Sequence, residues 1–395
     1  MGTRPSDSSS GQAWLANFTP EDRVRAAQLL NSLRIVGETT FRSSLADLVL
    51  AAVDRSEGPV GLYAVTDVPK VVLPGEEFPP PIGEPDSSSL VANLLRSIEA
   101  MRPDKTLFNV DVETLHTKRA RTILLVDDYT GSGGQASRYI ARWMSHPRIR
   151  SWMSFKWTRV EYVTYACSRS AFEKLSMVPA LASIDRVWAG LTFDAAAWTA
   201  SERLDIRDVC ERYAFKRRYA HGYEDSEGLF LSQHTVPNNL PAILWQRNRG
   251  RKAWTPMFKN RQLSPSQADE LLDYAPDIDA SRLANELGQR ALRETKSESA
   301  QSLLLLLALL AAGKRDDDRL ASSLGMPVQR VTALVGAATQ LGLCDSRRRL
   351  SNEGRAELRA AKTQPRPEPF ALVENDEPYY PQYKLFSSAR GSGRV

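Results

Sequence analysis

Residues 123–135 carry the side chains of this chain that are best suited to chemistry. Their sequence, ILLVDDYTGSGGQ, runs from apolar residues through Asp127 and Asp128 into a glycine-rich turn. Backbone N–H groups of such a turn at the start of a helix form an anion site, which the helix dipole favours. Two carboxylates at a strand end accept hydrogen bonds from neighbouring ribose hydroxyls or bind Mg²⁺ through water. The segment therefore predicts a ribose 5-phosphate site; the alternative is a structural strand end with a glycine turn.

The same segment resembles the signature of type I phosphoribosyltransferases, in which an apolar strand, two acids and a Thr-Gly-Gly-Thr-like turn follow one another. The resemblance implies that Asp127 and Asp128 act at the catalytic site by holding the ribose hydroxyls of phosphoribosyl pyrophosphate (PRPP). It implies Mg²⁺ as the cofactor, which neutralises the leaving pyrophosphate. It further implies that the 5-phosphate is held by Ser132, Gly133, Gly134 and Gln135.

Two departures from that signature concern the reaction. Gly131 stands where many purine enzymes of the family carry an acid or a small residue, so no general base is supplied there. Ser132 replaces the usual Thr, and Gln135 replaces the last Thr or Ser. The family's pyrophosphate loop follows an early strand, and residues 66–70 (TDVPK) occupy that place with Lys70 as the cation. These features predict phosphate binding and leave open whether pentosyl transfer takes place.

A second polar segment lies at residues 229–261, in the order HxxPNN…W…WxPxFxxR. Asn238 and Asn239 offer donors and acceptors, and a histidine such as His234 is a common acid or base, so a loop bearing all three is predicted to read a base or activate a nucleophile. A plain turn is the alternative, because Pro-Asn-Asn suits a turn. With WLANF and VDDYTGSG, the segment resembles phosphoribosyltransferase-like domains of bacterial conflict and antiphage systems, some encoded beside retron reverse transcriptases. That resemblance covers roughly residues 13–261.

Basic residues interleave with tryptophans between the two segments and within the second. Such a pattern suits contact with phosphates and stacking on bases, while ordinary surface charge is the alternative. Acidic residues Glu224, Asp225 and Glu227 interrupt the pattern. The members are Lys216, Arg217, Arg218, Trp245, Arg247, Arg249, Arg251, Lys252 and Trp254.

The elements that must position these residues alternate between strand and helix. This alternation predicts an α/β fold with a parallel sheet wound with helices. Residues 71–89 are rich in Pro, Gly and Glu and are predicted to form a long loop. Strands are expected at residues 59–65, 122–126, 160–166 and 187–193, and helices at residues 20–33, 41–53, 90–101 and 135–145.

Residues 300–360 resemble a winged helix-turn-helix, an all-helical module following the α/β part. Helices are expected at residues 303–312, 317–324 and 327–341, with a last helix from Asn352. The module predicts nucleic-acid contacts from outward side chains of its third helix and wing, with protein docking as the alternative. Those side chains are Arg330, Arg347, Arg348 and Arg349.

The chain is expected to have four parts: a disordered tail at residues 1–12, the phosphoribosyltransferase-like domain at residues 13–261, the winged-helix part at residues 262–362, and a partner-binding tail at residues 363–395. Hydrophobic residues at 42% and charged residues at 25% exclude wholesale disorder. A net charge of +5 permits a nucleic-acid partner. Three scattered cysteines and no long apolar run indicate a cytoplasmic protein without membrane contact.

The resemblance to domains of conflict and antiphage systems implies that the protein is the effector of a bacterial antiphage defence system of the retron type. The effector is expected to bind PRPP or a phosphoribosyl nucleotide and to act on a nucleotide or nucleic acid. Its expected partner is a nucleic acid or a nucleoprotein, such as a reverse transcriptase with its DNA/RNA product. The alternative is a PRPP-sensing transcriptional regulator that uses the winged helix on DNA and has no catalysis.

Overall fold

The computed structural model describes residues 3–68, 78–79, 87–194, 196, 198–247, 253–272, 274 and 298–363. The chain forms two compact units, Met1–Pro276 and Asp277–Val395. Several expectations fall outside the described residues: Lys70, Arg249, Arg251, Lys252, most of the loop at residues 71–89, and the tail from residue 364 onward with Tyr379, Tyr380, Tyr383, Lys384, Arg390 and Arg394.

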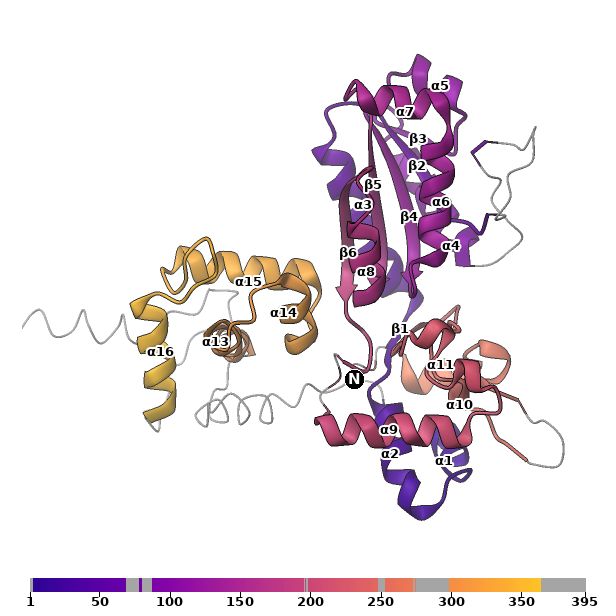
Figure 1. Ribbon diagram of the computed structural model, residues 1–395, viewed down its shortest axis with the longest axis vertical. Helices are drawn as coiled ribbons and strands as arrows, with labels where there is room; N and C mark the ends of the chain where they lie inside the picture. The colour runs from indigo at the N-terminus through magenta and orange to yellow at the C-terminus, as the bar shows by residue number, and fades with distance from the viewer. Residues whose placement is uncertain are drawn as a thin grey trace, which may run out of the picture. The chain divides into compact units, whose positions relative to one another are not determined.

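A five-stranded parallel sheet with the order β3-β2-β4-β5-β6 forms the centre of the first unit (Figure 1). This confirms the predicted α/β fold. The chain passes from β2 outward to β3 and returns to β4 on the other side of β2, so the strand order reverses between β2 and β4. Ligands of open α/β sheets bind at such a switch point, at the carboxyl ends of the strands. The strands are β2 (Val60–Ala64), β3 (Thr106–Phe108), β4 (Thr122–Thr130), β5 (Arg159–Cys167) and β6 (Leu181–Ala189).

Helices cover both faces of this sheet, which is why β2 and residues 123–126 of β4 are continuous apolar runs rather than alternating. Every residue of β2 is buried. One face packs against α3 (Glu38–Arg55) and α4 (Ser87–Met101). The other face packs against α5 (Val112–Thr117), α6 (Gly134–Ser145), α7 (Pro147–Ser154) and α8 (Arg169–Ser176).

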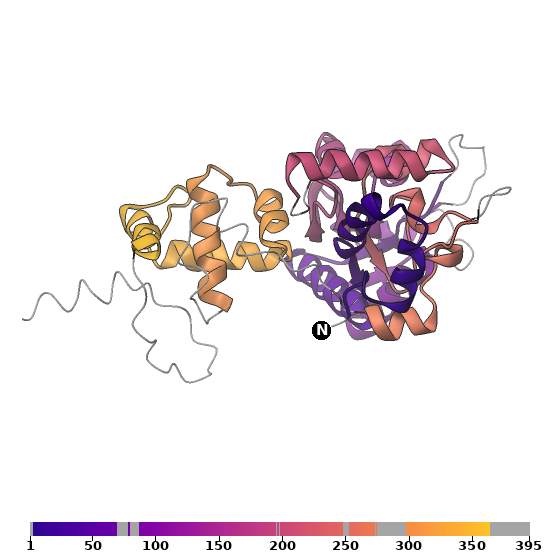
Figure 2. The same ribbon diagram turned by 90° about the horizontal axis from the view of Figure 1, so that it is seen from below.

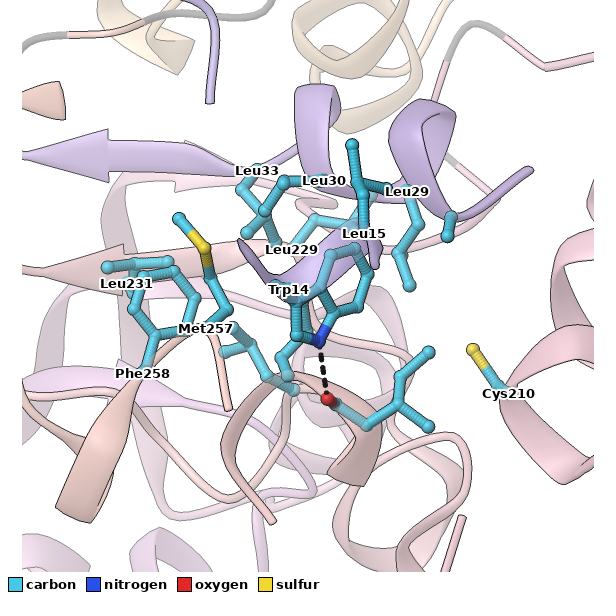
Figure 3. Packing of buried hydrophobic residues seen from close by; sticks show 14 of the residues in the cluster. Trp14, Leu15, Leu29, Leu30, Leu33, Cys210, Leu229, Leu231, Met257 and Phe258 are labelled. Carbon is cyan, nitrogen blue, oxygen red and sulfur yellow. Dashed lines mark hydrogen bonds between the residues drawn. The ribbon is translucent and has the colours of Figure 1, made fainter. Parts of the chain in front are cut away.

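A third core lies in a mostly helical lobe that joins the start of the chain to residues 193–271. Figures 1 and 2 show α2 and α9 side by side in it. Trp14 is fully buried at its centre, and its indole N–H donates to the Ile243 carbonyl at 2.8 Å (Figure 3). The lobe contains α1 (Ser9–Leu15), α2 (Pro20–Asn31), α9 (Ala200–Tyr213), α10 (Ala242–Trp245), α11 (Pro265–Leu271) and the parallel pair β1 (Arg34–Val36) and β7 (Phe230–Ser232).

Several local elements differ from the sequence-based expectations. Residues 9–12, placed in a disordered tail, belong to α1, which Ser8 caps by accepting the Gly11 N–H at 3.0 Å. The strands β1, β3 and β7 were not predicted. Each has three residues, which are too few to show the alternation of side chains that marks a strand. β6 begins at Leu181, earlier than the predicted strand at residues 187–193. The expected start of α2 is confirmed, with Thr19 accepting the Asp22 N–H at 3.4 Å.

In the part of the second unit that is described, residues 298–363, three helices are followed by a short hairpin and a final helix, as expected for a winged helix. An antiparallel bridge between Cys344 and Leu350 closes the hairpin, which forms the wing. None of the helices that the structure describes combines the length and apolar character needed to cross a membrane. The helices are α13 (Glu298–Ala311), α14 (Asp317–Leu324), α15 (Val328–Gln340) and α16 (Asn352–Thr363).

Candidate functional site

The glycine-rich turn connects β4 to α6 at the switch point of the sheet. β4 continues through both acids to Thr130, four residues beyond the predicted strand end, and α6 begins at Gly134. Gly133 has φ of 71°, a left-handed conformation that favours glycine. The Ser132 hydroxyl accepts the Gly134 N–H at 3.3 Å. The turn therefore places the N-terminus of a 12-residue helix beside the carboxyl end of β2.

Asp127 is buried, with 6% of its surface exposed, and its carboxylate is enclosed by hydrogen bonds. The Tyr162 hydroxyl donates to Oδ2 at 2.6 Å and the Thr130 hydroxyl donates to the same oxygen at 3.3 Å. Burial, with the nearby Asp128 charge, raises the pKa of Asp127 well above its ordinary value. Asp127 is thus held from three sides, because the Asp128 N–H also donates to Oδ1 at 3.0 Å.

Asp128 has a more open environment than Asp127. Its side chain is only partly buried, and its Oδ1 accepts the Tyr129 N–H at 2.8 Å. Successive side chains of a strand point to opposite faces of the sheet, so neighbouring acids meet different surroundings. Asp128 is therefore the acid better placed to meet a ligand from solution.

The β5–α8 junction supports the turn from one side. Ser168 caps α8 by accepting the Ala171 N–H at 3.0 Å, and its hydroxyl also donates to the Gly131 carbonyl. A Cβ on Gly133 would lie 3.3 Å from the Ala171 Cα. The turn thus packs against α8 too closely for a larger residue at position 133.

Asn239 packs directly against the turn, although it is more than 100 residues away in the sequence. A Cβ on Gly131 would lie 2.0 Å from the Asn239 Nδ2. The Asn239 amide is buried and donates to the Ser226 hydroxyl at 2.8 Å. Glycine at position 131 is therefore required by packing, since the neutral carboxamide of Asn239 fills the space where a side chain at 131 would project.

The other two residues of the HxxPNN segment lie in different places. The Asn238 carbonyl accepts the Tyr223 N–H at 2.9 Å, next to the Asn239 contact. His234 follows β7, and its Nε2 lies 3.1 Å from Oε2 of Glu38 in the first turn of α3. His234 and Glu38 are both about as much exposed as buried, with side-chain exposures of 36% and 40%. Asn238 therefore lies beside the Asn239 contact with the turn, whereas His234 forms a pair with Glu38 at the surface.

Four buried polar atoms around the turn have no hydrogen-bond partner among the described residues. They are Thr66 Oγ1 after β2, Tyr129 Oη in β4, and Ser137 Oγ and Arg138 Nε near the start of α6. A buried polar atom without a partner is costly, and each such atom in a native structure calls for an explanation. Thr66 lies in the predicted pyrophosphate loop and Tyr129 in the segment at residues 123–135, but the sequence did not identify Ser137 and Arg138, because only the fold places the end of β2 beside α6.

Arg138 and Lys174 are cations whose side chains lie beside the turn, and Arg138 also contacts the predicted pyrophosphate loop. The Arg138 Nη1 would lie 3.6 Å from a Cβ on Gly134, and its Nη2 pairs with Asp67 Oδ1 at 2.8 Å. Asp67 belongs to the predicted pyrophosphate loop. Within the described ranges, no three His, Cys, Asp or Glu side chains gather into a metal-binding group.

The three arginines in the wing of the second unit have different environments. Arg347 and Arg349 are exposed, as is Arg330 on α15. Arg348 has φ of 58° and turns back, placing its Nη2 2.8 Å from Asp317 Oδ1 and donating to the Arg315 carbonyl. Arg348 therefore ties the wing to the start of α14.

An open parallel sheet with two acids and a glycine-rich turn at its switch point is the arrangement expected of a phosphoribosyltransferase-like protein. The family model described as PRTase-CE matches residues 12–260, more than half of the chain, so the chain belongs to the PRTase-CE family. A second family model, described as wHTH-PRTase associated, matches residues 304–383 and identifies the winged helix. No curated protein and no solved structure matches the chain.

Proposed function

We propose that the first unit binds PRPP or a phosphoribosyl nucleotide at the β4–α6 turn. The observation that carries this proposal is the group of four unpartnered buried polar atoms around the turn. The backbone N–H groups of residues 132–135 would hold the 5-phosphate at the start of α6. Asp128 would accept a ribose hydroxyl, and Arg138 would compensate phosphate charge.

Mg²⁺ fits this site as an ion brought in by the diphosphate of the ligand. Asp128 is the accessible carboxylate of the pair, whereas Asp127 has both oxygens engaged and a raised pKa that disfavours its charged form. Mg²⁺ keeps several waters and uses one or two carboxylates together with substrate phosphates. Asp128 would therefore meet the ion through water, and the ion would neutralise charge on a leaving pyrophosphate.

Pentosyl transfer at this site would break the bond from the ribose to pyrophosphate and form a bond to an acceptor. Asn239 occupies the place where an acid would stand beside the ribose, and its carboxamide takes up no proton near neutrality. The acceptor must therefore lose its proton to another group or to water.

We further propose that the protein is the effector of a bacterial antiphage defence system of the retron type. The support is the sequence resemblance to domains of such systems. A second candidate is a PRPP-sensing regulator without catalysis, and the neutral Asn239 against Gly131 favours it. A neighbouring reverse transcriptase gene would support the first candidate and neighbouring purine genes the second.

Calorimetry with Mg²⁺-PRPP tests the ligand proposal. We expect the wild type to bind and the double variant Asp127→Asn/Asp128→Asn to bind about tenfold or more weakly, because ribose contacts are lost. Asp47→Asn/Glu57→Gln is the matched control, since both of its acids are exposed on or near α3. Absence of binding by the wild type would remove the proposal. Pyrophosphate release with an added nucleotide or nucleic acid would separate the enzyme from the regulator.

A further inference from the structure

A second surface with a clear chemical character lies in the lobe. It is formed by residues that come from different parts of the chain: the segments around η1 (Arg217–Tyr219) and η2 (Tyr223–Asp225), the end of α10, and η3 (Lys259–Arg261). We call it the Tyr219 surface, and its residues are Lys216, Arg218, Tyr219, Tyr223, Trp245 and Arg261.

Aromatic rings and cations alternate on the Tyr219 surface. The Tyr219 and Trp245 rings meet edge to face with centroids 5.8 Å apart. The Arg218 guanidinium lies 4.8 Å from the centre of the Tyr219 ring, and the Lys216 ammonium lies 5.9 Å from the centres of both rings. The Arg261 guanidinium lies 6.0 Å from the centre of the Trp245 ring. Cations held beside rings in this way suit a ligand that is both anionic and aromatic.

The positive charge of this surface is not neutralised within the protein. Across the described residues, Lys216, Arg218 and Arg261 form no ion pair with a carboxylate. The acids at its edge are Glu224 and Asp225, and Asp225 faces His221 at 3.6 Å. The Arg261 Nε does donate to the Val236 carbonyl at 2.8 Å, but that acceptor is neutral. An anionic partner would therefore meet three cations here that are not neutralised by a carboxylate of the described residues.

The Tyr219 surface adjoins the β4–α6 turn through direct contacts. A Cβ on Gly222 would lie 2.0 Å from the Asn239 carbonyl oxygen, and the Asn239 side chain packs against Gly131 of the turn. The next residue, Tyr223, is 39% exposed and donates its N–H to the Asn238 carbonyl at 2.9 Å. A chain-like ligand lying on the surface would thus extend toward the turn.

We infer that the Tyr219 surface binds single-stranded nucleic acid, with unpaired bases stacked on its rings and phosphates beside Lys216, Arg218 and Arg261. Unpaired bases are favoured over a duplex, because a duplex stacks its own bases and leaves none for the rings. The strand would present one nucleotide to the turn as the acceptor of the phosphoribosyl group: the bond from the ribose to pyrophosphate breaks, the bond to the acceptor forms, pyrophosphate leaves, and the acceptor's proton passes to water. That acceptor role rests on the proposed function, whereas binding of the strand does not.

Fluorescence anisotropy of the full chain with labelled oligothymidylate and oligouridylate tests this inference and compares DNA with RNA. Tyr219→Leu and Trp245→Leu should each weaken binding about fivefold or more, because stacking on a base is lost. Tyr223→Ala removes an exposed ring and should act in the same direction with the least risk to folding. Phe155→Leu/Trp157→Leu is the matched control: these rings are 64% and 54% exposed, stack at 5.4 Å and precede β5 at the opposite end of the sheet.

A charge variant tests the phosphate contacts separately. Lys216→Gln/Arg218→Gln/Arg261→Gln should flatten the salt dependence of oligonucleotide binding by about 0.7 in slope for each lost contact. The matched control is Lys118→Gln/Arg119→Gln/Arg150→Gln, three exposed cations elsewhere on the first unit. Binding of heparin with the same affinity in the ring variants and the wild type would confirm that the rings recognise bases rather than charge.

Two outcomes would overturn the inference: no binding of either oligonucleotide at low salt, or equal weakening by the ring variants and the Phe155/Trp157 control. Loss of binding only when Arg330, Arg347 and Arg349 are neutralised would place the nucleic-acid site on the winged helix, and this third outcome would overturn the inference as well.

Calorimetry with Mg²⁺-PRPP distinguishes failure of this inference from failure of the proposed function. The ring variants should retain PRPP binding, and Asp128→Asn should lose PRPP but retain the oligonucleotide.

Discussion

The end of β4 and the wing of the second unit each contain a run of like-charged residues, and the members of each run have different environments in the fold. In β4, Asp127 is enclosed by Tyr162 and Thr130 while Asp128 stays partly open. In the wing, Arg348 pairs with Asp317, while the arginines on either side of it are exposed. In each case one member of the run supports the local structure and its neighbour is available to a partner.

The physical cause of these different environments is not the same in the two regions. In β4 it is the alternation of side chains along a strand, which sends neighbouring residues to opposite faces. In the wing it is a left-handed turn at Arg348, whose φ is 58°, which reverses the chain and returns that side chain to α14. Adjacent residues of one charge therefore need not share a role, and each member of a run has to be tested singly.

The largest expected effect is on the PRPP affinity of variants of Asp127 and Asp128, and it tests whether the two acids have different roles. Asp128→Asn alone should weaken Mg²⁺-PRPP binding about tenfold or more, since it removes the accessible acceptor of a ribose hydroxyl. Asp127→Asn should weaken binding by less than about threefold, because its oxygens already accept bonds from protein groups. Isothermal calorimetry on the single variants measures both values. A greater loss with Asp127→Asn would reverse the roles assigned to the two acids.

A smaller effect is expected in the wing. Arg347→Gln/Arg349→Gln should lower the salt slope of duplex DNA binding by about 0.9 for each lost phosphate contact. Arg348→Gln should leave the slope unchanged and lower the stability of the second unit by about 1 kcal/mol or less, because the pair with Asp317 is partly exposed. Salt titrations and thermal unfolding give the two measurements. If duplex affinity is the same in all three proteins, the wing docks protein instead.

The smallest effect concerns the dependence of stability on pH. The pKa of Asp127 is raised in the folded protein, chiefly by burial, so the folded state binds more protons than the unfolded state above about pH 4. Stability is therefore full below that pH and falls as the pH rises through the raised pKa. Asp127→Asn should remove this fall, whereas Asp128→Asn should retain a downward slope. Urea unfolding at a series of pH values would detect the difference, and parallel curves for wild type and Asp127→Asn would contradict it.

Local patterns were sufficient to predict the elements that carry the turn and the winged helix. The apolar run before Asp127 predicted β4, and the glycine-rich turn predicted the start of α6 within one residue. α14 begins and ends where the sequence predicted, because Asp316 caps it and Gly325, with φ of 54°, ends it. Signals of this kind depend on residues within a few positions of one another, so they can be read without the fold.

The sequence by itself determined an α/β unit with a glycine-rich turn after β4, followed by a helical module with a basic wing. Only the tertiary structure decided which residues stand around that turn. It paired β1 with β7 across almost 200 residues, placed Asn239 against Gly131, and assembled the Tyr219 surface from separate segments. These contacts join residues far apart in the chain through side-chain packing, and packing between distant segments leaves no periodic or local signal in a single sequence.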